Sequence, residues 1–456
     1  MIAWLKSLVR DSSFPFKDIL HSAYNALPPS IAYGKVYRDM LRLFQESESW
    51  DRRTYEDHQN SRLSQLIKHA YDNVPYYREV FDEHGLAPRD IQTVSDLKKL
   101  PLLTSDTIKS RWDDFAAKNV SQFQREMSHT SGSTGPALYF YFDKTTIPVE
   151  RAQAMRHLLW LGYKAGDKIA VIKGQPLQTT EKMFKYLRGA KELRVSLAEP
   201  TEENLRQIAE ALAQYRPAFI RGWPSSIYTI ARWISENRRQ IPRPKYIVTS
   251  SENLYPYMKK RIEESFDAPV ADAYGQSEFV AYALQCAYRK AYHVQMETSI
   301  VEFIPYRGNL CEIVGTCLWN TAMPFIRYKT GDLAIKGGEP CPCGRQSDTI
   351  AEVIGRTSDI VFRDETSGAI SPISSCSFYD SEEIKEAQIL IEDDGAVRVR
   401  IAPRNSPLGA LHIRIKEEIA KCLDVPYEKI IVEEVQAIQP AESGKKALVV
   451  GRSPSL

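Results

Sequence analysis

The sequence predicts an α/β protein with a large N-terminal body and a small C-terminal α+β domain. The spacing of apolar residues is helical in the first 125 residues, alternates between strand and helix patterns from about residue 165, and changes again in the last hundred residues. The chain of 456 residues also exceeds the usual size of one compact core. These observations favour two domains of unequal size.

The first part of the chain, residues 1–125, is expected to be mainly helical. Five apolar residues follow the spacing i, i+3, i+4, i+7 and i+8: Leu63, Leu66, Ile67, Ala70 and Tyr71. They form one stripe along a helix, and Pro75 is expected to end that helix because proline cannot continue it. The stripe therefore predicts a helix that packs against the core.

The middle of the chain has the alternating pattern of an α/β body. A strand is expected at 168–172, a helix at 202–213 and a buried strand at 246–250.

The last hundred residues have a different pattern. Residues 388–392 and 397–401 are expected to pair as a hairpin around Asp393-Asp394-Gly395. A helix with Leu411, Ile415 and Ile419 on one face follows, and residues 430–435 predict another strand. We therefore expect a small α+β domain, with residues 1–355 in the large domain and 356–456 in the small one.

Composition excludes several classes of protein. The 60 basic residues nearly balance the 58 acidic ones, so the sequence has no nucleic-acid-binding charge pattern and a small-molecule partner is expected. No run of about 18 apolar residues occurs, which predicts no membrane span and a cytoplasmic protein. Seven cysteines, an odd number, argue against a disulfide framework. The oligomeric state has no signal in the sequence.

A glycine-rich loop at 128–136, SHTSGSTGP, has the composition of a phosphate-binding loop. Gly132 and Gly135 allow the main chain to approach an anion, and Ser131, Ser133 and Thr134 add hydroxyl donors. The loop is not a Walker A motif, because Pro136 follows Gly135 where that motif has lysine. A solvated loop can have the same composition, so phosphate binding stays open on this segment alone.

Four further segments carry chemically useful residues in loops or turns. The first, 274–278, reads YGQSE and combines an aromatic ring with a carboxylate. Asp332 lies in a turn after a strand-like run, where it could accept hydrogen bonds from a ribose diol. Arg356 lies at the expected domain boundary, and Lys445 and Lys446 follow a glycine near the C-terminus.

In order and separation, these five segments resemble the core motifs of the acyl-adenylate-forming (ANL) superfamily, which includes acyl-CoA synthetases. Residues 74–109 resemble the N-terminal region of phenylacetate-CoA ligases and of their CapK-like relatives, which are associated with capsular polysaccharide synthesis. Residues 27–40 and 274–303 favour the CapK-like branch. The resemblance covers most of the chain and implies a large adenylate-forming domain followed by a mobile lid domain.

The resemblance implies a role for each motif in binding Mg²⁺-ATP. Tyr274 would stack on adenine, Asp332 would bind the ribose hydroxyls, and Arg356 would assist at the ribose or phosphates. Glu278 would help to hold Mg²⁺, and Lys445 would stabilise charge at the α-phosphate; a slip of one residue would give that role to Lys446. The residues expected at the β- and γ-phosphates are Ser131, Gly132, Ser133, Thr134 and Gly135, and Gly275, Ser277 and Glu252 are also expected at the nucleotide. The expected catalytic set is Lys445, Glu278 and Thr134.

A second constellation has the spacing of a metal site. Cys286 and His293 are followed, after a long gap, by the Cys341-Pro342-Cys343-Gly344 turn. Three thiolates and one imidazole suit a closed tetrahedral Zn²⁺ site with a structural role, and four protein ligands leave no open position for catalysis. The alternative is four reduced, partly buried side chains without a metal.

Two features depart from the family pattern. Pro136 takes the place of the usual lysine of the phosphate loop, so the backbone and hydroxyls would hold the phosphates. The segment that follows Arg356 also lacks the glycine-containing pattern that helps phenylacetate-CoA ligases to bind CoA.

We therefore expect a ligase that converts a carboxylic acid to acyl-AMP, releases pyrophosphate, and transfers the acyl group to an amine. The amine would be an amino sugar or amino acid in surface polysaccharide synthesis. The alternatives are an aryl- or acyl-CoA ligase, with CoA as a thiol acceptor, and a catalytically inactive nucleotide-binding scaffold protein. The sequence does not identify the acid.

Overall fold

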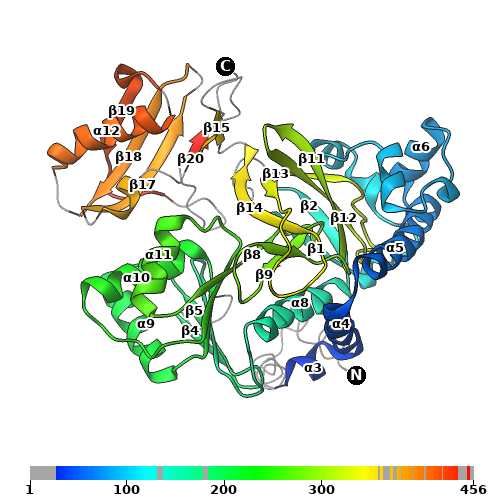
Figure 1. Cartoon of the computed structure of the whole chain (residues 1–456), viewed down its shortest axis with the longest axis horizontal. Helices are drawn as coiled ribbons and strands as arrows, with labels where there is room; N and C mark the ends of the chain where they lie inside the picture. The colour runs from blue at the N-terminus through cyan, green and yellow to red at the C-terminus, as the bar shows by residue number, and fades with distance from the viewer. Residues whose placement is uncertain are drawn as a thin grey trace.

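A computed structural model describes residues 27–130, 137–177, 183–357, 360–362, 370–372, 377–381, 383–392, 394–404, 407–423, 425–439 and 449–451. Figure 1 shows a large body that carries a smaller C-terminal unit at one end. The predicted fold class, α/β with a large N-terminal and a small C-terminal unit, is confirmed. The domain boundary at residue 355 stays a prediction.

Helices dominate the described residues up to 125, as predicted. They are α3 (Pro29–Ala32), α4 (Gly34–Glu46), α5 (Arg52–Asn73), α6 (Pro75–Glu83) and α7 (Ser105–Ser110). Short 3₁₀ helices lie at Ser47–Ser49, Pro88–Asp90, Val94–Lys99, Trp112–Phe115 and Gln122–Gln124. The side chain of Asp51 caps α5 by accepting a hydrogen bond from the Thr54 N–H at 2.8 Å. Pro75 begins the next helix, which confirms that it interrupts the first.

A twelve-stranded sheet forms the centre of the molecule, in the order β11-β12-β13-β14-β10-β9-β8-β7-β6-β3-β5-β4. Its parallel part comprises β3 (Ile169–Lys173), β5 (Glu192–Ser196), β6 (Phe219–Gly222), β7 (Tyr246–Ser250) and β8 (Val270–Gly275), and β4 (Phe184–Leu187) is antiparallel to β5. The antiparallel part comprises β9 (Tyr282–Gln285), β10 (Tyr292–Val294), β11 (Ser299–Arg307), β12 (Leu310–Cys317), β13 (Tyr328–Lys336) and β14 (Thr349–Arg356).

Helices cover both faces of the parallel part. On one face pack α9 (Glu202–Tyr215), α10 (Pro224–Glu236) and α11 (Pro256–Phe266), and on the other lies α8 (Thr146–Trp160). A two-stranded hairpin of β1 (Arg125–His129) and β2 (Tyr139–Asp143) precedes α8.

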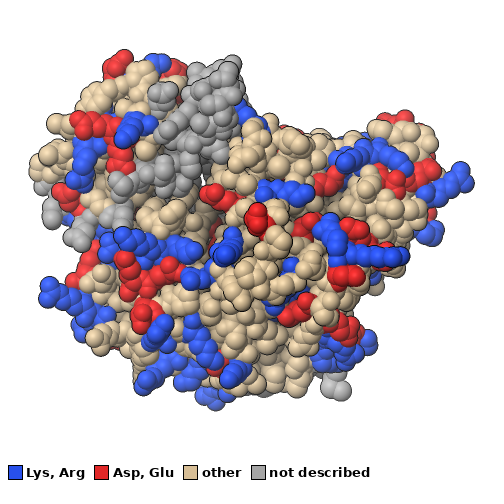
Figure 2. All heavy atoms as spheres, in the orientation of Figure 1, with Lys and Arg blue, Asp and Glu red and all other residues tan. Residues whose placement is uncertain are grey.

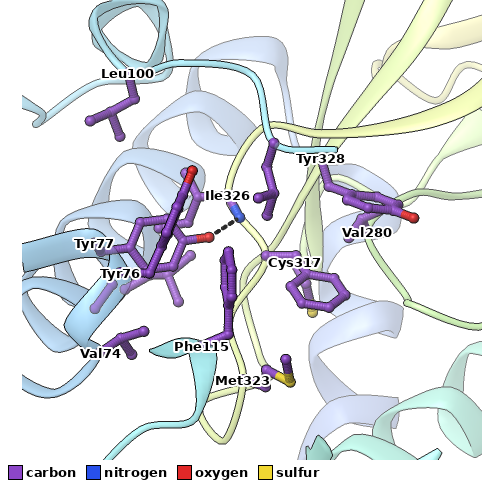
Figure 3. Packing of buried hydrophobic residues seen from close by; sticks show 14 of the residues in the cluster. Val74, Tyr76, Tyr77, Leu100, Phe115, Val280, Cys317, Met323, Ile326 and Tyr328 are labelled. Atoms are coloured by element: carbon purple, nitrogen blue, oxygen red, sulfur yellow. Dashed lines mark hydrogen bonds between the residues drawn. The ribbon is translucent and has the colours of Figure 1, made fainter. Parts of the chain in front are cut away.

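The N-terminal helices share a core with the antiparallel strands. Figure 3 shows Tyr76, Tyr77 and Phe115 meeting Ile326 and Met323 in this core. The Tyr77 hydroxyl accepts a hydrogen bond from the Ile326 N–H at 2.9 Å and donates one to the Pro324 carbonyl at 3.0 Å. This buried hydroxyl therefore fixes the segment between β12 and β13 against α6.

The C-terminal unit has its own sheet, in the order β19-β18-β17-β20. The predicted hairpin is β17 (Ile384–Ile391) and β18 (Val397–Pro403), the predicted helix is α12 (Ala410–Leu423) and the predicted last strand is β19 (Ile430–Glu434). The remaining elements are β15 (Ile360–Phe362), β16 (Ile370–Pro372), β20 (Val449–Gly451) and 3₁₀ helices at Ser377–Asp380 and Tyr427–Lys429.

Polar contacts join the two units. Arg404 forms an ion pair with Glu236 of α10 at 2.7 Å, and Arg232 of the same helix donates to the Ile384 carbonyl at 2.8 Å. The rings of Tyr257 and Tyr379 stack with their centroids 5.8 Å apart. The C-terminal sheet therefore lies over α10 and α11, as Figure 1 shows.

Basic and acidic side chains are interspersed over the face of the molecule that Figure 2 shows. Among the described helices, none has both the length and the apolar character needed to cross a bilayer.

Tyr77→Phe should lower the free energy of unfolding by about 1–3 kcal/mol, because the buried N–H of Ile326 loses its acceptor. Urea denaturation measures this change, with Tyr288→Phe as the control because that side chain is exposed. A Tyr77 variant as stable as the wild type would show that the hydroxyl does not fix this segment.

Candidate functional site

A cavity of about 600 Å³ lies at the carboxyl ends of the parallel strands. Residues that end or follow β3, β6, β7 and β8 line it, and residues of the C-terminal unit close it from the other side. Open α/β sheets bind ligands at this edge, where adjacent connections diverge.

Two of the predicted motifs meet in this cavity through Tyr274. Its hydroxyl donates a hydrogen bond to Oδ2 of Asp332 at 2.8 Å, and burial, followed by the Asp332 charge, raises the pKa of Tyr274 well above its usual value. Arg356 lies opposite Asp332 in the β13–β14 register, with Nε 3.3 Å from Oδ1. The structure thus brings together three residues that lie far apart in sequence.

Glu278 lines the same cavity and is 7% exposed. Its Oε1 accepts a hydrogen bond from the Tyr328 hydroxyl at 3.0 Å. Burial raises the pKa of the Glu278 carboxyl above its usual value, and the hydrogen bond from Tyr328 opposes that shift. A carboxylate held in this way is a favourable site for a cation, which would offset the cost of its burial.

Glu252, Gly275 and Ser277 also line the cavity. Oε2 of Glu252 accepts a hydrogen bond from the Ser225 N–H at 3.1 Å, in the first turn of α10. Gly275 is required where it stands, because a Cβ there would lie 2.4 Å from the ring of Tyr282.

Part of the predicted site lies outside the described residues. Thr130 lines the cavity and forms two hydrogen bonds with Leu138. The Thr130 N–H donates to the Leu138 carbonyl at 2.9 Å, and the Leu138 N–H donates to Oγ1 of Thr130 at 3.0 Å. The phosphate-loop residues between them, Ser131, Gly132, Ser133, Thr134 and Gly135, fall outside the description, and so do Lys445 and Lys446.

The four predicted metal ligands form a compact cluster. Their ligand atoms all lie within 4.8 Å of one another. Sγ of Cys286 is 3.6 Å from Sγ of Cys341, and Sγ of Cys343 is 3.3 Å from Nε2 of His293. Zn–S bonds of about 2.3 Å in a tetrahedron place the sulfurs about 3.8 Å apart, so the donor set and its spacing fit Zn²⁺.

Sequence reasoning missed Asp272, a buried carboxylate that lines the cavity two residues before Tyr274. It accepts hydrogen bonds from the hydroxyls of Thr249 and Tyr292, the latter at 2.8 Å. Burial raises the pKa of Asp272 to about 6, against the effect of both bonds. The signal available in the sequence was an acidic residue inside an otherwise apolar strand.

Known proteins are similar to this chain over most of its length. No protein-family model matches the chain. It is 23% identical to Protein CapK of Staphylococcus aureus over 98% of this chain and 99% of that protein. It is 24% identical to phenylacetate-coenzyme A ligase of Thermus thermophilus, over 74% of this chain and 78% of that protein. It is 28% identical to phenylacetate-coenzyme A ligase of Escherichia coli, over 66% of this chain and 71% of that protein.

Solved structures show the same fold. A 2-hydroxyisobutyryl-CoA ligase in the postadenylation state, with a bound adenylate, matches 89% of this chain and 91% of its own with a TM-score of 0.70 and 19% identity. The same ligase in the thioesterification state matches with a TM-score of 0.58 and 18% identity.

Asp272→Asn should remove a pH dependence of stability. The pKa of Asp272 is about 6 in the folded state and 3.8 for an unperturbed aspartate. The free energy of unfolding of the wild type should therefore fall by up to about 3 kcal/mol as pH rises between those values. The variant should lack this loss.

Urea denaturation from pH 4 to pH 8 measures the effect. Asp113→Asn, at an exposed carboxylate, is the control. Parallel pH profiles for the wild type and the Asp272 variant would contradict the raised pKa.

Proposed function

Because the chain belongs to the acyl-adenylate-forming superfamily, in the group that contains CapK and the phenylacetate-CoA ligases, we propose that it activates a carboxylic acid with ATP. Its enzyme class is that of the AMP-forming ligases. The proposed product of the first step is acyl-AMP, with release of pyrophosphate, and the second step transfers the acyl group to an amine.

One observation carries the proposal: Tyr274, Glu278, Asp332 and Arg356 converge on a single cavity. Asp332 offers the ribose diol a carboxylate whose charge Arg356 balances at 3.3 Å. The Tyr274 ring, held by its hydroxyl bond to Asp332, offers a stacking surface for adenine beside that carboxylate. Glu278 would hold Mg²⁺, which supplies positive charge to the phosphates when bound.

The chemistry requires positioning and charge stabilisation. A carboxylate oxygen of the acid bonds to the α-phosphorus as the bond to the pyrophosphate oxygen breaks. Lys445 would stabilise the charge that develops on the α-phosphate, and Ser131–Gly135 would hold the departing pyrophosphate with Thr134 as a hydroxyl donor. Lys445 precedes by four residues Val449, which lines the cavity.

In the second step the acceptor attacks the acyl carbonyl carbon and AMP departs. We propose an amine of surface polysaccharide synthesis as the acceptor, because the chain resembles CapK over 98% of its length and the segment after Arg356 lacks the pattern that helps phenylacetate-CoA ligases to bind CoA. The phenylacetate-CoA ligases among the relatives support CoA as the alternative acceptor. An enzyme that consumes ATP would work in the cytoplasm.

We also propose that Cys286, His293, Cys341 and Cys343 bind one structural Zn²⁺. Cys286 follows β9, His293 lies in β10, and the two other cysteines lie between β13 and β14. The metal would tie these connections together at one end of the antiparallel strands.

Lys445→Ala should lower acid-dependent exchange of labelled pyrophosphate into ATP at least 100-fold, which corresponds to about 2.7 kcal/mol of barrier. ATP should still bind, which equilibrium dialysis measures, and Lys429→Ala is the matched control on the same domain. If Lys446→Ala had the large effect and Lys445→Ala had none, the two roles would be exchanged. No exchange with any acid or amino acid would favour the inactive scaffold alternative.

Elemental analysis should find one equivalent of zinc in the purified protein, and Cys341→Ser should lower both the zinc content and the melting temperature. Cys311→Ser is the matched control, because Cys311 lies in β12 outside the cluster. A fully stable protein that contains no metal would refute the zinc site.

A further inference from the structure

The cavity has a second polar wall that the proposed nucleotide site does not use. Three residues form this wall: Glu150 of α8, Arg221 of β6 and Tyr282 of β9. They line the same cavity as Tyr274 and Glu278, so a molecule bound against them would be near the nucleotide.

Strand geometry explains why these residues share one face of the sheet. Phe219 lies in one buried cluster with Leu158 of α8 and with Leu161, which follows that helix. Arg221, two positions further along β6, lies on the same face. Tyr282 pairs with Gly275 in the β8–β9 register, and its ring covers the position that a side chain would take there. α8 packs on this face through Leu158, and Glu150 of the same helix lines the cavity.

Glu150 and Arg221 both carry charge into the cavity without neutralising each other. The Glu150 side chain is 24% exposed and forms an ion pair with Nε of its neighbour Arg151 at 3.3 Å, and the Lys173 ammonium also interacts with its charge. Among the residues that the structure describes, none accepts a hydrogen bond from the Arg221 guanidinium or pairs with it within 4.0 Å.

Both charges lie near the Tyr282 hydroxyl. Burial raises the pKa of Tyr282 to about 12, the Glu150 carboxylate adds to this shift, and the Arg221 guanidinium opposes it. The wall therefore has a carboxylate acceptor and a guanidinium donor beside one phenol.

An aromatic or aliphatic acyl chain is a poor match for this wall. It would remove water from a carboxylate and a guanidinium without replacing their hydrogen bonds, at a cost of several kcal/mol. Pockets for such ligands are lined mainly by apolar side chains. A ligand that offers a cation to Glu150 and an oxygen acceptor to Arg221 would satisfy both.

We propose that the acid activated at this site is an amino acid, with its ammonium group held by Glu150 and an oxygen acceptor held by Arg221. This inference rests on the proposed function, because it names the substrate class of the same adenylation reaction. It concerns the acid, which the preceding argument left open, and not the amine acceptor.

The test is pyrophosphate exchange into ATP with three panels of acids: amino acids, their analogues with hydroxyl in place of the amino group, and arylacetic or fatty acids. For one or more amino acids, the kcat/KM of the wild type should be at least 10-fold higher than for the matching hydroxy acid. It should also be at least 10-fold higher than for any arylacetic or fatty acid. Exchange that favours arylacetic or fatty acids would overturn this inference and leave the ligase proposal intact. No exchange with any acid would contradict the ligase proposal itself, and this inference with it.

Variants test the two contacts. Glu150→Gln should raise the KM for the amino acid at least 10-fold and reduce the preference for the amino over the hydroxy acid. Arg221→Gln should also raise that KM at least 10-fold, and Arg221→Lys should recover part of the loss because it keeps the charge. The KM for ATP should change less than 2-fold in each, which separates a substrate contact from a folding defect.

Arg53→Gln and Glu210→Gln are the matched controls, because both side chains are exposed. If Glu150→Gln and Arg221→Gln kept the wild-type KM for the amino acid and the wild-type preference, the assignment would be wrong.

Discussion

The candidate site depends on the change of strand direction at β8. This strand pairs in parallel with β7 and antiparallel with β9, so the chain that leaves its carboxyl end turns back across the cavity. The turn carries residues 274–278, and the hydrogen bond from Tyr274 to Asp332 joins it to β13. Arg356 lies opposite Asp332 in the sheet register, so the backbone pairing of β13 and β14 puts the Arg356 guanidinium beside the Asp332 carboxylate.

Much of this arrangement could be predicted from local pattern. The bounds of β7 follow from a run of apolar residues, and the C-terminal hairpin from an Asp-Asp-Gly turn between alternating strands. Glu150 and Asp272 could not be identified in the same way. Residues on most sides of α8 are buried, and they include the polar residues Arg156 and His157. The pattern of polar residues in the sequence therefore does not show which face of the helix lines the cavity. Asp272 lies in a strand in which nearly every position is buried, and its partners come from two other strands.

The cysteine-histidine cluster and the cavity share a strand. Tyr292 and His293 are neighbours in β10, and neighbouring side chains of a strand point to opposite faces. The Tyr292 hydroxyl bonds to Asp272 at the cavity, whereas His293 lies beside Cys343 in the cluster. Loosening the cluster would therefore also disturb a hydrogen bond at the cavity wall.

The contact between Gly275 and Tyr282 sets limits on how this fold can diversify. Any side chain at position 275 would displace the Tyr282 ring, and the two residues are fixed opposite each other by strand pairing. The contact between Gly275 and Tyr282 thus joins the turn that carries Tyr274 to the wall that contains Glu150. Under the proposed function, substitutions on α8 and β6 would alter the acid that the cavity accepts, while this glycine and tyrosine stayed unchanged.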